Sequence, residues 1–153
     1  MRIATLSVLA ALSAAAFASA QFTAEPEYLC VSAKETKVYK GPRDSETVSW
    51  KMWKFFPVEV VSYRGDWVKI RDFEGDTGWV KKSAVSGMAC VQTRKKDAVL
   101  RKSPGGAAVW VLDRGYPFRL FSVKGDWVEV SDLETATGWL PVSAVWGAPR
   151  PKE

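Results

Sequence analysis

The chain has 153 residues, contains no histidine and carries a formal charge of +5. The lack of histidine removes the commonest general base near neutral pH and the commonest metal ligand, which argues against an enzyme or a metal site. The positive charge is too mild to indicate a nucleic-acid-binding protein. We therefore expect a non-enzymatic protein with no metal, no cofactor and no nucleic acid partner.

Residues 1–20 have the pattern of a cleaved signal peptide. Arg2 supplies a positive start, Ile3–Phe17 is a mostly apolar run, and Ala18-Ser-Ala20 is a small-residue cleavage site. The apolar run is too short for a membrane-spanning helix. The pattern predicts an exported protein, periplasmic or secreted, with no membrane span in the mature chain.

Beyond the signal peptide, short alternating segments predominate and no window keeps a helical period. Trp50 and Met52 alternate with polar residues, as Val68 and Ile70 do further along the chain. Such alternation predicts strands with one buried face. It also assigns Trp50 and its counterpart Trp110 to the core.

Two kinds of turn separate these strands. Gly65 lies in an Arg-Gly-Asp turn, where glycine can adopt a positive φ. A second hairpin connection follows at 72–77. Pairing Phe73 with Thr77 sets Arg71 opposite Trp79 and leaves the apolar residues of both strands on one face.

The segment 57–85 is repeated at 117–145, with 14 of 29 positions identical at a constant offset of 60. Such self-similarity means one structural unit used twice. About five short strands per unit indicate an all-β fold of two small barrels. We expect a signal peptide at 1–20, domains at 28–87 and 88–147, and a Pro-rich tail at 148–153.

Cys30 and Cys90 are also sixty residues apart. Export makes a disulfide chemically permissible, and a bridge requires their Cα atoms within about 7 Å. Only a two-fold-like docking of the first strands would bring these residues together. The alternative is two thiols buried separately in the two barrels.

Several motifs together resemble the bacterial SH3-like (SH3b) domain. They are Gly65-Asp-Trp-Val-Lys-Ile70, Thr77-Gly-Trp-Val80, Ser83-Ala-Val85 and the upstream Val38-Tyr-Lys-Gly-Pro42. The ending Val145-Trp-Gly147 is similar to that of paired SH3-like proteins of proteobacterial envelopes. The resemblance covers roughly residues 28 to 147 and implies two tandem SH3-like barrels. Because such domains are fused to cell-wall hydrolases as apparent peptidoglycan-targeting modules, it also implies a binding function.

Aromatic and basic side chains are the candidate ligand-binding residues. Trp53 is not repeated in the second unit, so the fold alone does not require it, and Trp146 is expected to dock the repeats. Trp67 and Trp79 are repeated, which also fits a structural role. The full set of candidates is Trp53, Tyr63, Trp67, Trp79, Lys51, Lys54 and Arg71.

These features predict a monomer that recognises peptidoglycan stem peptides or another envelope component, with aromatics for contact area and Lys/Arg for carboxylates. The alternative is an adaptor or assembly factor that binds an extended peptide of an envelope protein. A third possibility is a scaffold for an exported enzyme. Carboxylate recognition should weaken steeply with ionic strength, whereas an apolar peptide groove should not.

Overall fold

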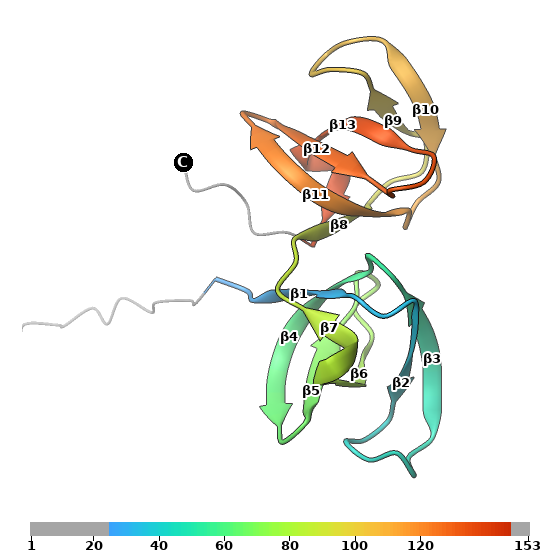
Figure 1. Cartoon of the computed structure of the whole chain (residues 1–153), viewed down its shortest axis with the longest axis vertical. Coiled ribbons are helices and arrows are strands. Elements are labelled where there is room, and N and C mark those ends of the chain that lie inside the picture. The colour runs from blue at the N-terminus through green and yellow to red at the C-terminus, as the bar shows by residue number, and fades with distance from the viewer. Residues whose placement is uncertain (1–24, 148–153) are drawn as a thin grey trace, which may run out of the picture.

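The computed structural model describes residues 25–147, so the predicted signal peptide and Pro-rich tail lie outside the described residues. The chain forms two seven-stranded antiparallel sheets, one for each repeat. Each sheet curls into a small barrel, and a short connection joins the two barrels, which lie one above the other (Figure 1). This is the all-β, two-barrel fold predicted from the repeat. Within residues 25–147, no helix has the length and apolar character needed to span a membrane.

The first barrel has the strand order β3-β2-β6-β5-β4-β1-β7. A single 3₁₀ turn, η1 (Lys82–Ala84), leads into its last strand. The barrel has seven strands rather than about five, and one of them, β7, has only two residues and is too short to show a period. The strands are β1 (Tyr28–Val31), β2 (Glu35–Tyr39), β3 (Val48–Trp53), β4 (Pro57–Arg64), β5 (Trp67–Arg71), β6 (Thr77–Lys81) and β7 (Val85–Ser86).

The second barrel repeats this order as β10-β9-β13-β12-β11-β8-β14. Its 3₁₀ turn is η2 (Val142–Ala144). The strands are β8 (Cys90–Thr93), β9 (Ala98–Arg101), β10 (Ala108–Leu112), β11 (Pro117–Lys124), β12 (Trp127–Ser131), β13 (Thr137–Pro141) and β14 (Val145–Trp146).

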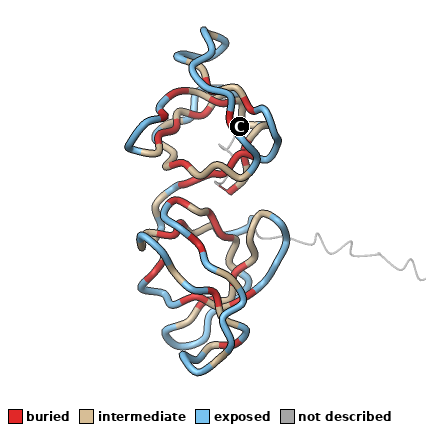
Figure 2. The backbone as a smooth tube through the Cα atoms, turned by 90° about the vertical axis from the view of Figure 1, so that its right-hand side faces the viewer, coloured by how far each residue is buried: buried red, intermediate tan, exposed pale blue. Residues whose placement is uncertain are grey.

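Each barrel has its own apolar core, and buried and exposed residues alternate along the strands (Figure 2). The first core is built around Met52, Val58 and Ile70, and the second around Leu100 and Phe118. The turn glycines Gly65 and Gly125 both adopt φ of 56°, which confirms the positive φ expected of them. In strands such as β5, β6, β9 and β13, the alternation in sequence therefore reflects one buried face.

The predicted register of the β5–β6 hairpin is wrong by two residues. Arg71 pairs with Thr77, and Trp79 pairs with Lys69. The connection is longer than expected because Asp72 donates its backbone N–H to the Asp76 carbonyl and accepts the Asp76 N–H on its carboxylate. Since side chains alternate with period two, a shift of two leaves every residue on its predicted face.

The prediction that both Trp50 and Trp110 belong to the core is wrong for Trp110. Trp50 is partly buried and packs against the first core. Its indole lies 3.1 Å from where a Cβ on Gly78 would stand, whereas the corresponding space at Gly138 is approached by Leu100. Trp110 is not among the atoms nearest to Gly138 and is 53% exposed.

Candidate functional site

The two barrels dock through their first strands. A disulfide joins Cys30 on β1 to Cys90 on β8, with their Cα atoms 5.7 Å apart. Both cysteines are buried together with Phe55. Trp146 of the second barrel meets Tyr28 of the first edge to face, with ring centroids 5.3 Å apart, so it docks the repeats as expected. Equivalent strands of the two repeats thus face each other across the bridge.

This arrangement places two equivalent contacts on either side of the disulfide, and one of them is closed. In the closed contact, Arg114 forms an ion pair with Glu74 and its guanidinium lies 4.7 Å from the centroid of the Phe73 ring. A Cβ at Gly115 would stand 3.1 Å from the same ring, so glycine allows the close approach. The second barrel therefore packs directly against the 72–76 turn of the first barrel.

The other contact is open. At the offset of 60, Lys54 corresponds to Arg114 of the closed contact. Leu133 and Glu134 correspond to its Phe73 and Glu74. Among the ion pairs of residues 25–147, none joins Lys54 to Glu134. Between the barrels at this point lies a cleft of about 390 Å³. Its walls are Lys34, Trp53, Lys54, Phe55, Tyr116, Pro117, Asp132, Leu133 and Glu134.

A substitution between the repeats accounts for the difference. Phe55 stands where the closed contact has Gly115, and its ring packs beside the disulfide. Lys54 lies over that ring, with Nζ 5.3 Å from the centroid, rather than reaching across to the second barrel. Leu133 remains 53% exposed. We refer to this open contact as the inter-barrel cleft.

The inter-barrel cleft combines an aromatic surface with both signs of charge. Trp53 is 49% exposed and packs edge to face on Phe56 at 5.8 Å between ring centroids. Lys34 and Lys54 come from the first barrel, and the carboxylates of Asp132 and Glu134 come from the second. The volume is within the usual range for small-ligand sites. Such a surface suits a zwitterionic ligand with some apolar length.

Asp132 is held in its ionised form. Partial burial raises its pKa, but backbone N–H donors from Ala136, Glu134 and Thr135 and the Tyr116 hydroxyl together lower the pKa of Asp132 to about 2. The Tyr116 Oη–Asp132 Oδ2 distance is 2.8 Å. The first repeat has Phe56 in place of Tyr116. The second barrel therefore presents a permanent negative charge to the inter-barrel cleft.

This charge predicts a loss of stability in acid that depends on Asp132. Because its folded pKa is below the ordinary value of 3.8, its contribution is present above that pH and is lost as pH falls toward about 2. Between pH 3.8 and about 2, the free energy of unfolding should fall less in Asp132→Asn than in the wild type. Urea unfolding at several pH values measures this difference. Asp72→Asn is the matched control, since burial raises the pKa of Asp72 and its contribution has the opposite sign. An acid profile of Asp132→Asn identical to wild type would contradict this account.

Most of the other predicted site residues occupy the outer face of the first barrel and do not line the cleft. Trp67 meets Tyr39 edge to face at 5.3 Å, and Tyr39 pairs with Trp79 in the backbone ladder. Arg71 donates to Glu59 at 3.0 Å. Lys51 pairs with a glutamate, Glu35, at 2.8 Å. Of the predicted residues, the cleft brings together only Trp53 and Lys54.

Tyr63 does not join Trp67 and Trp79 in a groove. It pairs across the strands with Val68, so it lies on the opposite face of the hairpin from Trp67. Its hydroxyl donates to Glu27 Oε1 at 2.6 Å, and this hydrogen bond, with partial burial, raises the pKa of Tyr63 to about 12. Tyr63 thus anchors the segment that precedes β1.

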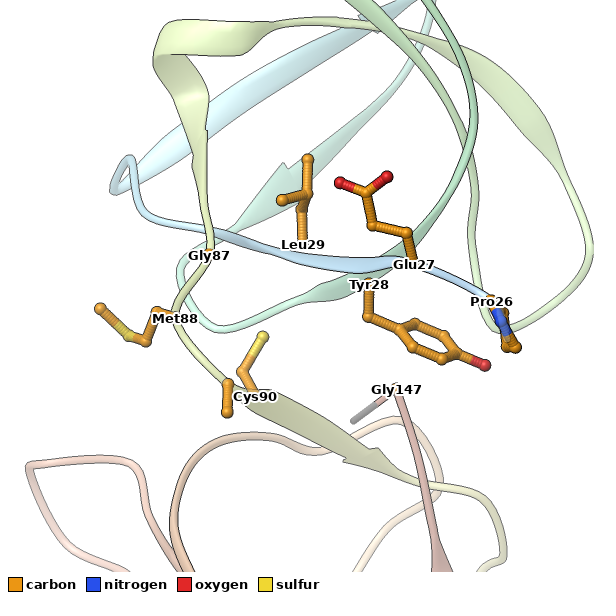
Figure 3. A pocket seen from close by; sticks show the side chains of 9 residues that line it. Pro26, Glu27, Tyr28, Leu29, Gly87, Met88, Cys90 and Gly147 are labelled. Atoms are coloured by element: carbon orange, nitrogen blue, oxygen red, sulfur yellow. The ribbon is translucent and has the colours of Figure 1, made fainter. Parts of the chain in front are cut away.

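Glu27 also lines a second hollow between the barrels, of about 280 Å³. β1 and the connection through Met88 to Cys90 form its walls, and Gly147 closes one side (Figure 3). It presents the Glu27 carboxylate, which already accepts the Tyr63 hydroxyl, and no basic side chain. The inter-barrel cleft is therefore the stronger candidate.

The sequence did not predict the acidic wall of the cleft, Asp132 and Glu134. One signal was present: a basic residue at 54 and 114 and a glutamate at 74 and 134 recur in both repeats. Exposed opposite charges kept in both copies of a unit indicate a docking contact between the copies. Reading the recurrence of charges, as well as of aromatics, would have indicated Glu134.

The fold and the docked pair of barrels define a tandem SH3-like protein. A family model described as "Bacterial SH3 domain" matches residues 32–87 and again 94–147. The chain therefore belongs to the bacterial SH3 domain family. Among residues 25–147, no group of three or more His, Cys, Asp or Glu side chains is placed to hold a metal ion.

The similarity to solved structures is weak. NlpC1 from Trichomonas vaginalis is 11% identical with a TM-score of 0.38, and the match covers 84% of this chain and 49% of that one. An NlpC/P60 family protein from Bacillus cereus is 15% identical with a TM-score of 0.37, over 82% and 59% of the two chains. The chain thus spans about half the length of these structures. Comparison with curated protein sequences finds no significant match.

Proposed function

We propose that this protein is an exported, non-catalytic cell-wall-binding module whose inter-barrel cleft recognises peptidoglycan stem peptides. One observation carries the proposal: of two equivalent contacts between the barrels, one is sealed by its own ion pair, whereas the other keeps its Lys54 and Glu134 side chains apart around a cleft. Membership of the bacterial SH3 domain family supports a binding role.

The chemistry of the cleft fits a peptide with charges of both signs. Lys34 and Lys54 can bind stem-peptide carboxylates, and Glu134, with the negative charge of Asp132 beside it, can bind an amino group. Exposed ion pairs contribute only about 0.2–1 kcal/mol each. Contact area from Trp53 must therefore supply much of the affinity, as aromatic anchors commonly do.

The same side chains disfavour a polyanionic ligand. The permanent charge of Asp132, beside Glu134, would repel phosphates along a nucleic acid strand. The basic residues on the opposite wall are too few to neutralise a run of phosphates. A short zwitterionic peptide is the ligand class that uses both walls.

Co-sedimentation with purified peptidoglycan sacculi tests this function. The mature protein should pellet saturably at low salt and less at high salt, because screening weakens contacts between exposed charges. Addition of soluble stem peptide should release it, which identifies the peptide rather than the glycan as ligand. No pelleting at either salt concentration would overturn the proposal.

Trp53→Ala should reduce sacculus binding about tenfold or more, the effect expected when a central aromatic contact is lost. The melting temperature should change little, because half of the Trp53 side chain is already exposed. Binding is measured by co-sedimentation and stability by thermal unfolding.

Phe121→Ala is the matched control, since Phe121 has nearly the same exposure, 48%, but does not line the cleft. It should bind sacculi as wild type does. A large fall in melting temperature for Trp53→Ala with unchanged binding would assign Trp53 to packing instead.

A further inference from the structure

β10 is an edge strand whose exposed side chains are uncharged, with a β-bulge between Ala108 and Trp110. It stands at the end of the second sheet, and within residues 25–147 it pairs only with β9. Its sequence is Ala-Val-Trp-Val-Leu, with Val109, Trp110 and Val111 exposed by 38%, 53% and 64%. An exposed edge presents unpaired N–H and C=O groups, and an apolar edge without charge is a template for another strand.

The first repeat shows how such an edge is normally protected. β3 occupies the same edge of its sheet. At the offset of 60, its Ser49 and Lys51 correspond to Val109 and Val111. Lys51 is exposed and paired with Glu35, and a lysine on an edge strand discourages pairing with another chain. The second repeat has replaced both polar residues with valine.

We propose that β10 pairs antiparallel with β10 of a second copy of this chain, around a two-fold axis at Trp110. A two-fold interface must be self-complementary, and the strand reads similarly in both directions from Trp110. Val109 of each copy then lies opposite Val111 of the other, and Ala108 lies opposite Leu112. No like charges meet within the strand.

Charges that flank β10 are also complementary under this pairing. Lys102 lies across from Ala107 at one end of the strand, joined by a backbone hydrogen bond, and Arg101 pairs with Ala108. Asp113 follows the other end. Antiparallel pairing brings the acidic end of one strand to the basic end of its partner. The sequence predicted a monomer, and this edge instead favours a dimer.

Sedimentation equilibrium over a wide range of concentration tests this interface. The wild-type mass should rise from monomer to dimer, and Val111→Lys, which restores the residue of the first repeat, should weaken dimerisation at least tenfold. Val109→Ser, the other first-repeat residue, provides a second variant in case the lysine perturbs folding. Val123→Lys, at another exposed valine outside β10, is the control and should dimerise as wild type does.

Near-UV circular dichroism should show that each variant keeps native packing. A wild-type mass that stays monomeric at all concentrations would overturn the proposal. So would a Val111→Lys variant that dimerises as strongly as wild type, because the interface would then lie elsewhere. Neither result bears on whether the inter-barrel cleft binds stem peptides.

Discussion

Phe118→Ala is expected to lower the free energy of unfolding by about 3 to 5 kcal/mol, the usual cost of removing a buried aromatic ring. Phe118 is fully buried in the second core, and its ring lies 4.8 Å from that of Tyr116, centroid to centroid. The strands around it are joined by backbone hydrogen bonds, so the cavity can close only in part. Urea unfolding at neutral pH measures the loss.

The first repeat supplies the matched comparison. Val58 is the equivalent residue and is also fully buried. Val58→Ala removes only two methyl groups and should cost roughly 2 kcal/mol. If Phe118→Ala cost no more than Val58→Ala, the ring would not be the centre of the second core.

Loss of the Cys30–Cys90 bridge is expected to lower stability by about 4 kcal/mol, because the bridge closes a loop of this length in the unfolded chain. The two cysteines are separated by 60 residues and buried at the junction between the barrels. The Cys30→Ala, Cys90→Ala double variant, unfolded in urea, measures this contribution. Its sacculus binding should also weaken, because the bridge fixes the two walls of the inter-barrel cleft.

Reduction of the wild type should reproduce the stability of the double variant. Thiol titration of the denatured, unreduced protein provides the direct check and should find no reactive thiol. Two reactive thiols per chain would show that the cysteines are buried separately. A stability loss near zero would show instead that the barrels hold their orientation without the bridge.

The fold could be read from the sequence because the signals that specify it are local. Alternation identified the buried face of strands such as β5 and β6, and the repeat showed that the unit occurs twice. The β5–β6 register was missed because a slip of two residues preserves every face, so only the hydrogen bonds of the Asp72 backbone N–H and carboxylate distinguish the two pairings.

The site was only half predictable. Trp53 and Lys54 were apparent because the second repeat lacks the tryptophan. Asp132 and Glu134 were not, because they come from the other barrel and meet the first wall only through docking. Trp110 was assigned to the core from its position in the repeat. Alternation does not distinguish it from Trp50, although Trp50 packs over Gly78 and Trp110 does not pack over Gly138.

The paired contacts around the disulfide have an evolutionary consequence. If two identical single-barrel chains docked in this way, every substitution would alter both contacts at once. A substitution that closed one contact would close the other, and a charged residue that suits a ligand would appear at both contacts. Covalent fusion of the repeats removes that restriction, since Gly115 and Phe55 now vary independently. Duplication thus lets one contact specialise in holding the halves together while its twin is free to diverge.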